Sequence, residues 1–316
     1  MAHPIQGLVK YHGLRNSKQR LPYHDSISVC IQALCTTTTV EVLSESRKND
    51  ITINGKQPLV NERKRIETVL NRLKELTQFQ GSFKIVSQNS LETGKGLGFS
   101  ASGFGALGLA ATKALDLNLD AISLSEIVRL GAGSATRSLA GGFSVWYANR
   151  NGRSYAEQLK TPRDMDFSMI IVPVHSDVKT DEAHVEVQSS CLFKARLKNI
   201  QGLLGIMKAS INKGDTAAIG RLAEEDTLNL HAITMTGKSH MILWEPDTIR
   251  IIKKIISIRE NGTQAWYSMD TGPSVFINTY EKNTARIVEQ LHEIGFRNAL
   301  TSTIGGKTVL SGNHLF

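Results

Sequence analysis

The sequence predicts an α+β protein, because segments with strand patterns and segments with helix patterns follow one another in mixed order. The chain has 316 residues, of which 41% are hydrophobic, enough for one large domain or two lobes around a sizeable core. The order does not alternate regularly between strand and helix, and no internal repeat is evident. We place a boundary between an N-terminal lobe, residues 1–165, and a C-terminal lobe, residues 166–316, just before a fresh apolar strand.

The first third of the chain predicts strands and one long helix. Residues 26–43 are rich in β-branched residues with partial alternation, which predicts one or two strands. Residues 51–56 predict a short strand that ends in an Asn-Gly turn, a hairpin signal. Apolar positions at helical spacing predict a helix over 59–77, and residues 82–87 predict a strand.

The remaining elements follow from the same periodicities. Residues 103–116 predict a helix of small and apolar residues, and 123–130 a short helix with a capping box from Ser123 to Glu126. The second half predicts a strand at 167–174, helices at 191–212, 215–230 and 245–259, strands at 265–269 and 275–278, a helix at 281–294 and a last strand at 308–310.

Charge favours a small polyanionic substrate. The net charge is +8, from 37 Lys and Arg against 29 Asp and Glu, but the basic residues are scattered. The densest group, residues 63–65, belongs to the solvated face of a predicted helix. Aromatic residues do not interleave with basic ones as a stacking platform for nucleic acid requires. We therefore expect no nucleic-acid partner, and a field that steers a small anion.

Composition also bounds the cellular setting. The three cysteines, Cys30, Cys35 and Cys191, have no Cys-x-x-Cys spacing, which favours a reduced cytoplasmic protein without a disulfide framework or a metal site. No run approaches the roughly 18 apolar residues of a membrane span. The N-terminus has neither a basic start nor an apolar stretch, so we expect no signal peptide and no membrane partner.

A glycine-rich loop is the first candidate for chemistry. Residues 93–104 lead directly into the predicted helix of small residues. Such a loop can direct several backbone N–H groups at one anion, with the positive end of the helix behind them. It matches neither the dinucleotide-binding nor the Walker pattern, and a turn that feeds a buried helix is the alternative. The candidate phosphate-binding residues are Lys95, Gly96, Gly98, Ser100, Ala101 and Ser102.

A second small-residue loop, residues 130–143, carries one arginine and two serines. Arg137 can clamp a carboxylate or phosphate through two parallel hydrogen bonds, and Ser134 and Ser138 can surround the same anion. The alternative is a helix whose small residues allow close packing, with the arginine paired to an acid.

Two strand ends complete the set of candidates. Lys179 and Thr180 follow an apolar strand and could touch phosphate, although a polar turn is the default interpretation. Asp270 lies where an apolar strand meets a Gly-Pro turn, a junction where catalytic residues often occur. An aspartate that only shapes this turn is the alternative.

The order of these motifs resembles a known family. Lys-Tyr-x-Gly, Leu-Pro-x-x-x-Ser-Ile-Ser-Val, Gly-Leu-x-x-Ser-Ala-Ser-Gly-Phe, Gly-Ser-Ala-x-Arg-Ser-Leu-x-Gly-Gly, Leu-His-Ala and Asp-x-Gly-Pro occur in sequence from Lys10 to about Ile304. The series is similar to the mevalonate diphosphate decarboxylase branch of the GHMP kinase superfamily. The arginine and Asp-x-Gly-Pro motifs are specific to this branch, whereas the glycine-rich loop belongs to the superfamily.

The resemblance implies a two-lobed GHMP kinase fold with the substrate in a cleft between the lobes, and commonly a homodimer. Its N-terminal lobe would be of the ribosomal protein S5 domain 2-like type, and its C-terminal lobe would carry the catalytic aspartate. The family phosphorylates the C3 hydroxyl of a phosphorylated mevalonate with ATP, and that phosphate leaves as CO2 departs. The implied catalytic residues are Asp270, Lys10 and Arg137, and the implied substrate-binding residues are Tyr11, Ser134 and Ser138. Lys179 and Thr180 join the substrate-binding candidates because of their place at a strand end.

The sequence departs from the family pattern at four places. Leu14 replaces a lysine whose expected partner is the substrate diphosphate, which favours a C5 monophosphate. Ile5 replaces an asparagine near the carboxylate. Gly98-Phe99 replaces Ala-Ser and adds bulk beside the usual triphosphate path, and Lys95 adds a cation where a small residue is usual.

These departures favour the archaeal variant, which decarboxylates mevalonate 3,5-bisphosphate to isopentenyl phosphate, CO2 and phosphate without ATP and without a metal. Retention of both Lys10 and Asp270 argues against a kinase that stops at phosphorylation. An ATP- and Mg²⁺-dependent decarboxylase of phosphomevalonate or diphosphomevalonate, and a GHMP small-molecule kinase, stay open as alternatives. A non-enzymatic anion or nucleic-acid binder has only the net charge in its favour.

Overall fold

The computed structural model describes residues 1–44, 48–91, 97–175 and 180–316, the last segment without the side chains of residues 180–181. The strands described are β1 Ile5–Val9, β2 Leu14–Asn16, β3 Leu21–Pro22, β4 Ser26–Cys30, β5 Thr36–Leu43, β6 Asp50–Ile53, β7 Ser82–Asn89, β8 Phe143–Trp146, β9 Ala156–Gln158, β10 Ser168–Val172, β11 Ala265–Ser268, β12 Val275–Thr279 and β13 Leu300–Ser302. The α-helices described are α1 Val60–Thr77, α2 Phe99–Ala114, α3 Ala121–Gly131, α4 Ala135–Ala140, α5 Thr180–Glu186, α6 Phe193–Lys213, α7 Thr216–Met235, α8 Pro246–Glu260 and α9 Thr284–Glu293.

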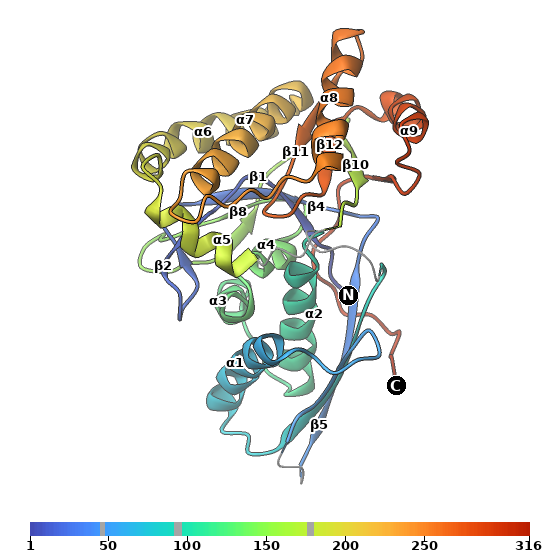
Figure 1. Cartoon of the computed structure of the whole chain (residues 1–316). Coiled ribbons are helices and arrows are strands. Elements are labelled where there is room, and N and C mark those ends of the chain that lie inside the picture. Colours follow the sequence, from blue (N-terminus) through green and yellow to red (C-terminus); the bar gives the residue numbers. More distant parts are fainter. Residues whose placement is uncertain (45–47, 92–96, 176–179) are drawn as a thin grey trace.

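The sheets divide between the two halves of the chain. The first half forms an antiparallel sheet in the order β1-β4-β8-β9 and a second sheet in the order β5-β7-β6, and the second half forms a sheet in the order β11-β12-β10-β13. Helix α2 packs against β5, with α1 and α3 beside α2, and α6 to α9 gather in the upper part of Figure 1. The predicted α+β class is confirmed.

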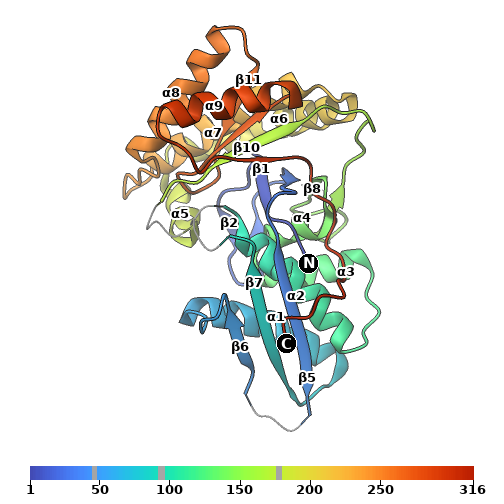
Figure 2. The same ribbon diagram turned by 90° about the vertical axis from the view of Figure 1, so that its right-hand side faces the viewer.

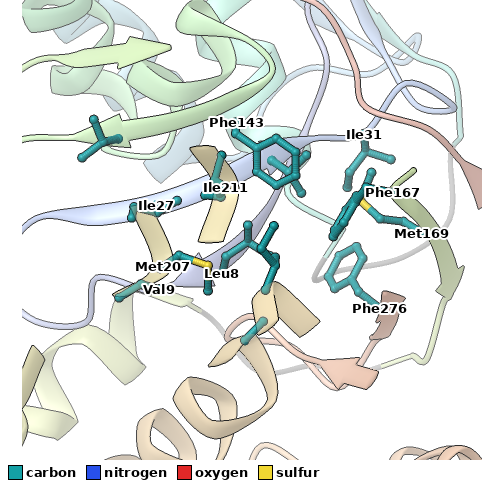
Figure 3. Close-up of a cluster of buried hydrophobic side chains, with 14 of the residues drawn as sticks. Leu8, Val9, Ile27, Ile31, Phe143, Phe167, Met169, Met207, Ile211 and Phe276 are labelled. Atoms are coloured by element: carbon teal, nitrogen blue, oxygen red, sulfur yellow. The ribbon is translucent and has the colours of Figure 1, made fainter. Parts of the chain in front are cut away.

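Separate apolar clusters hold these layers together. One joins α1, α2 and α3 to the β5-β7-β6 sheet through residues such as Val69, Phe83 and Leu107. Another connects the two halves: Leu8, Ile27 and Phe143 from the first sheet meet Met169 and Phe276 from the C-terminal sheet, with Met207 and Ile211 of α6 (Figure 3). The strand β1 is thereby packed directly against elements of the second half, which fixes the position of its last residues.

The chain end returns to the first half. After β13, Ile304 forms a bridge with Ile31, Val309 N donates to Met1 O at 3.0 Å, and Leu315 N donates to Thr39 Oγ1 at 3.0 Å. Figure 2 shows this red segment running down to the sheet that contains β5. Among the described helices, none is long and apolar enough to cross a membrane.

Most sequence-predicted elements are confirmed, and two expectations are wrong in detail. Residues 308–310 do not form a strand; the last strand is β13. The α3 cap is Asp120, whose carboxylate accepts from Ser123 N at 2.6 Å, because that residue lies one turn ahead of the expected capping box. The predicted Asn-Gly turn after β6 is confirmed: Asn54 and Gly55 both have positive φ, and an antiparallel bridge between Ile53 and Lys56 closes the turn.

Candidate active site

A buried lysine lies directly after β1, at the junction of the two halves. Lys10 follows Val9 directly and is 4% exposed. Its Nζ lies 3.7 Å from Asp226 Oδ2 and donates to Thr227 Oγ1 at 3.0 Å, both on α7. Burial lowers the pKa of Lys10, and the charges of Asp226 and Asp270 act against that shift. A cation held in the interior by two carboxylates is a strong local source of field.

Asp270 lies two residues beyond the end of β11. Its Oδ1 accepts a hydrogen bond from Gly7 N at 2.9 Å, so the aspartate is tied to the strand that ends at Lys10. A Cβ at position 7 would lie 2.8 Å from the same oxygen, which explains a glycine at this close approach. Burial raises the pKa of Asp270, and the charge of Lys10 is the largest influence that lowers it again. The structure thus brings the two predicted catalytic residues together.

Arg137 is the third member of the predicted set and lies on the short helix α4. Its side chain is 2% exposed, and its Nε and Nη1 have no hydrogen-bond partner among the residues that the structure describes. Its guanidinium carbon lies 5.4 Å from the ring centre of Tyr11 and 5.8 Å from that of Trp146. Burial lowers the pKa of Arg137, while the charge of Asp270 raises it. A buried cation with free, forked donors is suited to a carboxylate or phosphate.

Tyr11 and Ser134 accompany Arg137. The Tyr11 ring packs edge-on against Trp146 at 4.8 Å and stacks with His184 at 4.9 Å. Ser134 is half-buried and precedes α4. Tyr11 is thus the neighbour of Lys10 after β1, and Ser134 is the N-cap residue of the helix that carries Arg137.

Other predicted contacts point elsewhere. The Ser138 hydroxyl is fully buried and donates to His3 O at 2.6 Å, and the Ser102 hydroxyl is fully buried against Thr36 Oγ1 at 2.6 Å. Ala101 is also fully buried, in a cluster with Ile5 and Cys30. A contact of either serine with substrate would have to replace its interior hydrogen bond, so these residues support the local fold.

In the described part of the glycine-rich loop, Ser100 is accessible to a ligand. Ser100 is exposed in the first turn of α2. Gly98 has φ +72°, and a Cβ there would lie 2.9 Å from Ile5 O, so the loop start packs tightly on β1. The Phe99 ring packs against the apolar cluster that joins the two halves. Lys95, Gly96 and Lys179 lie outside the described residues, and Thr180 begins α5 but its side chain is not described.

Sequence reasoning missed the residues that surround Lys10. Asp226 and Thr227 are fully buried on α7, in the same stripe as Ile219, Ala223 and Leu230. An aspartate inside an apolar stripe could have indicated a buried ion pair, because a buried carboxylate needs a partner. The described residues contain no group of three or more His, Cys, Asp or Glu that could hold a metal ion. A metal-free reaction stays a prediction.

Comparison with known proteins identifies the family. The Diphosphomevalonate decarboxylase-like N-terminal domain matches residues 2–156, and the Mevalonate 5-diphosphate decarboxylase C-terminal domain matches residues 177–311. Phosphomevalonate decarboxylase of Haloferax volcanii is 37% identical over 98% of this chain and 96% of its own length. Diphosphomevalonate decarboxylase of Debaryomyces hansenii is 29% identical over 90% of this chain and 80% of its own.

Solved structures agree with this assignment. Mevalonate diphosphate decarboxylase from Staphylococcus aureus superimposes with a TM-score of 0.92 at 28% identity, covering 97% of this chain and 95% of that one. A structure described as MDDEF in complex with MVAPP, AMPPCP and magnesium has a TM-score of 0.91 at 27% identity, with the same coverage. The chain therefore has the GHMP kinase fold and belongs to the diphosphomevalonate decarboxylase family, as a carboxy-lyase of the mevalonate pathway.

Proposed function

We propose that this enzyme decarboxylates a mevalonate that carries a single phosphate on C5, and that it releases isopentenyl phosphate. The observation that carries the proposal is the pairing of the buried Lys10 and Asp270 beside Arg137, whose Nε and Nη1 find no partner among the described residues. This set supplies a carboxylate, a charge that favours its ionised form, and a free receptor for the substrate carboxylate.

The residues match the electron flow of the reaction. The bond between C1 and C2 breaks and releases CO2, its electron pair forms the C2–C3 double bond, and the C3–O bond breaks as phosphate departs with its own electron pair. Positive charge develops at C3 before the double bond is complete. Asp270 would stabilise that charge, Lys10 would favour the ionised form of Asp270, and Arg137 would hold the carboxylate in place until CO2 leaves.

Leu14 supports a C5 monophosphate. It begins β2, four residues after Lys10, where the resemblance implies a lysine that faces the second phosphate. A leucine offers no hydrogen bond or charge to that group. The Haloferax volcanii relative is named for phosphomevalonate, a substrate of this kind.

The name of that relative also bears on nucleotide use. Phosphomevalonate has a free C3 hydroxyl, which is a poor leaving group, so its elimination requires a phosphoryl donor. ATP with Mg²⁺ would supply that phosphate, and a related structure is described with AMPPCP and magnesium. Ser100 and the first backbone N–H groups of α2 would face the nucleotide phosphates. We therefore place ATP-dependent phosphomevalonate decarboxylation first.

The second candidate is the nucleotide-free conversion of mevalonate 3,5-bisphosphate. The departures at Phe99 and Lys95 favour it, because both alter the loop that would otherwise face the triphosphate. In this form the substrate arrives with its leaving group in place, and the same Lys10, Asp270 and Arg137 carry the reaction.

A four-way turnover assay separates these forms. The protein is incubated with mevalonate 5-phosphate or 5-diphosphate, each with ATP and Mg²⁺, with mevalonate 5-phosphate alone, and with mevalonate 3,5-bisphosphate alone, and CO2 and the alkenyl product are measured. Product from 5-phosphate only when ATP is present supports the first form. Product from the bisphosphate without nucleotide, and none from 5-phosphate with ATP, assigns the second. Preferential turnover of the 5-diphosphate would reject the role given to Leu14.

The homodimer and the reduced cytoplasmic setting stay predictions. Sedimentation equilibrium at micromolar concentration tests the first: a mass near twice the 34.7 kDa chain is expected, and a mass near 34.7 kDa would contradict it.

A further inference from the structure

The ammonium group of Lys10 has no donor left for a ligand. Its Nζ donates to Thr227 Oγ1 at 3.0 Å, to Ser268 Oγ at 3.1 Å and to Ala223 O at 3.4 Å. A lysine ammonium has three N–H donors, and these three acceptors account for all of them. Lys10 therefore acts on the reaction as a fixed charge beside Asp270.

Thr227 is the hub of this arrangement. Its Oγ1 accepts from Lys10 Nζ at 3.0 Å and from Met269 N at 3.2 Å, and its own hydroxyl donates to Ala223 O at 2.7 Å. One hydroxyl thus joins Lys10, which directly follows β1, to the backbone of the residue that precedes Asp270. The same oxygen lies 3.3 Å from Ser268 Oγ, so all its hydrogen-bonding contacts are with protein groups.

Asp226, the preceding residue, balances the charges. Its side chain is fully buried; Oδ2 accepts from Lys10 N at 2.8 Å, and Oδ1 accepts from Arg196 Nη2 at 2.9 Å. The same Arg196 nitrogen donates to Lys10 O at 2.7 Å. Asp226 therefore accepts a hydrogen bond from the backbone of Lys10. It is also the carboxylate nearest to the ammonium group, with Oδ2 3.7 Å from Nζ.

We propose that Asp226 and Thr227 are positioning residues of the decarboxylase: Thr227 aligns Lys10 with Asp270, and Asp226 keeps Lys10 charged. The inference rests on the proposed function, in which the Lys10 charge favours an ionised Asp270. Both residues act through Lys10 across the junction of the two halves, since α7 belongs to the second half and β1 to the first.

Four charged or titratable groups influence Lys10 from the elements around it. Asp226 and His231 come from α7, Arg196 from α6, and Asp270 from the loop after β11. Burial lowers the pKa of Lys10, the charges of Asp226 and Asp270 raise it, and the charge of Arg196 lowers it. Removal of the Asp226 charge and removal of the Arg196 charge should therefore move the titration of Lys10 in opposite directions.

Thr227→Val and Thr227→Ser form the first test. Valine has the shape of threonine but removes all the hydrogen bonds of the hydroxyl, whereas serine keeps the hydroxyl. We expect Thr227→Val to lower kcat roughly 10- to 100-fold with KM nearly unchanged, because a misplaced catalytic group costs rate more than binding. We expect Thr227→Ser to stay within about threefold of wild type. Equal activity of the valine variant and wild type, or equal impairment of both folded variants, would overturn the role of the hydroxyl.

Asp226→Asn and Arg196→Gln form the second test, with Glu225→Gln as the matched control. Glu225 is the exposed neighbour on the same helix, so its substitution removes one negative charge without touching Lys10. NMR titration of the Lys10 side-chain carbon Cε, labelled with ¹³C, follows its ionisation without relying on activity. We expect the Lys10 pKa to fall by about one unit or more in Asp226→Asn, to rise in Arg196→Gln, and to stay unchanged in Glu225→Gln.

The two tests fail in distinguishable ways. If wild type releases no CO2 from any phosphorylated mevalonate, the proposed function fails, while the Lys10 titration still reports on Asp226. If wild type turns over but the Lys10 pKa is the same in wild type and Asp226→Asn, the charge role of Asp226 is wrong. If Thr227→Val does not fold, the displacement of Lys10 Nζ in a crystal structure of Thr227→Ala decides. An unmoved Nζ there would overturn the alignment role.

Discussion

The free energy of unfolding should fall steeply when the pH drops from 7.5 to 5, because the core holds neutral histidines. Burial, with a smaller contribution from the Arg196 charge, lowers the pKa of His24 to about 4. Burial and the charge of Lys10 lower the pKa of His231 to about 3. The unfolded chain, with ordinary histidine values near 6.5, binds more protons than the folded chain between these limits. Stability is therefore fully present above pH 6.5 and is lost as the pH falls below it.

The size of the effect follows from the pH interval. From 6.5 to 5 is about 1.5 units, and each unit is worth about 1.4 kcal/mol for each group, so each histidine removes roughly 2 kcal/mol and the pair roughly 4 kcal/mol. Burial also lowers the pKa of His12, which acts in the same direction. Burial raises the pKa of Asp270, so its stability contribution is present at low pH and lost as the pH rises through its folded pKa. Asp270 thus offsets part of the histidine effect.

Urea unfolding at pH 7.5, 6.5 and 5.0, followed by tryptophan fluorescence and circular dichroism, measures the difference. In wild type we expect a fall of roughly 4 kcal/mol, and in His24→Asn about half of it, because one of the two buried titrations is gone. His292→Asn is the control, since His292 is exposed on α9 and should leave the difference unchanged. An unfolding free energy that is constant or rises between pH 7.5 and 5 would refute the assignment of neutral buried histidines.

The remaining predictions concern the active site. Asp270→Asn should lower kcat by roughly 10³-fold or more while substrate still binds, because the charge that favours the developing cation is lost; single-turnover rates near wild type would remove Asp270 from the mechanism. Arg137→Met should weaken substrate binding by roughly 10²-fold or more, yet raise the free energy of unfolding of the ligand-free protein, because a buried cation with unpartnered donors disappears. Calorimetric titration measures the substrate affinity, and urea unfolding measures the stability. A variant that binds substrate normally and is less stable than wild type would contradict the prediction. Leu14→Lys should raise kcat/KM for the 5-diphosphate relative to the 5-phosphate by roughly tenfold, the effect of one added charged contact; an unchanged ratio would mean that position 14 does not face the second phosphate.

Elements with a strong local period were predictable from the sequence. The helix expected at 215–230 is the first part of α7, and that at 245–259 differs from α8 by a single residue at each end. The strand predicted at 308–310 is wrong, because within this segment only Val309 pairs with another residue in the manner of a strand. Leu310 is 56% exposed, and Val309 exchanges two backbone hydrogen bonds with Met1. Whether this terminal segment is buried enough to form a strand depends on where it packs in the folded chain. A local window of the sequence does not contain that information.

Local patterns predicted Arg137 and Asp270 as candidates, and the family motifs added Lys10 and grouped the three into one candidate site. Gly7 and Asp270 are 263 residues apart, and Lys10 and Asp226 are 216 apart, so no local pattern relates them. The motifs predict Lys10, Arg137 and Asp270 together because the resemblance implies a shared chemistry for them. Asp226 and Thr227 were missed because they contact Lys10 from α7, and a helical period treats them as two more buried positions.

The structure bears on both interpretations of the small-residue loop around Arg137: an anion-binding arginine, or close packing with the arginine paired to an acid. A Cβ on Gly133 would lie 2.5 Å from the Trp146 ring, so close packing does require a glycine there. That packing places Trp146 beside the Arg137 guanidinium. The Arg137 donors Nε and Nη1 nevertheless meet no described acid, contrary to the alternative of an arginine paired within the fold.

The proposed function gives the two buried cations of the candidate site different roles, and the hydrogen bonds of Lys10 and Arg137 agree with this division. Lys10 has each of its donors occupied by protein groups, so a ligand could bind it only by breaking a satisfied network. Arg137 is equally buried but keeps Nε and Nη1 unpartnered, a cost to the ligand-free fold that a substrate carboxylate would remove. Binding and charge stabilisation are therefore assigned to separate residues. A ligand that enters would complete the hydrogen bonds of Arg137 without displacing Lys10, so Asp270 could keep its counter-charge as CO2 and phosphate leave.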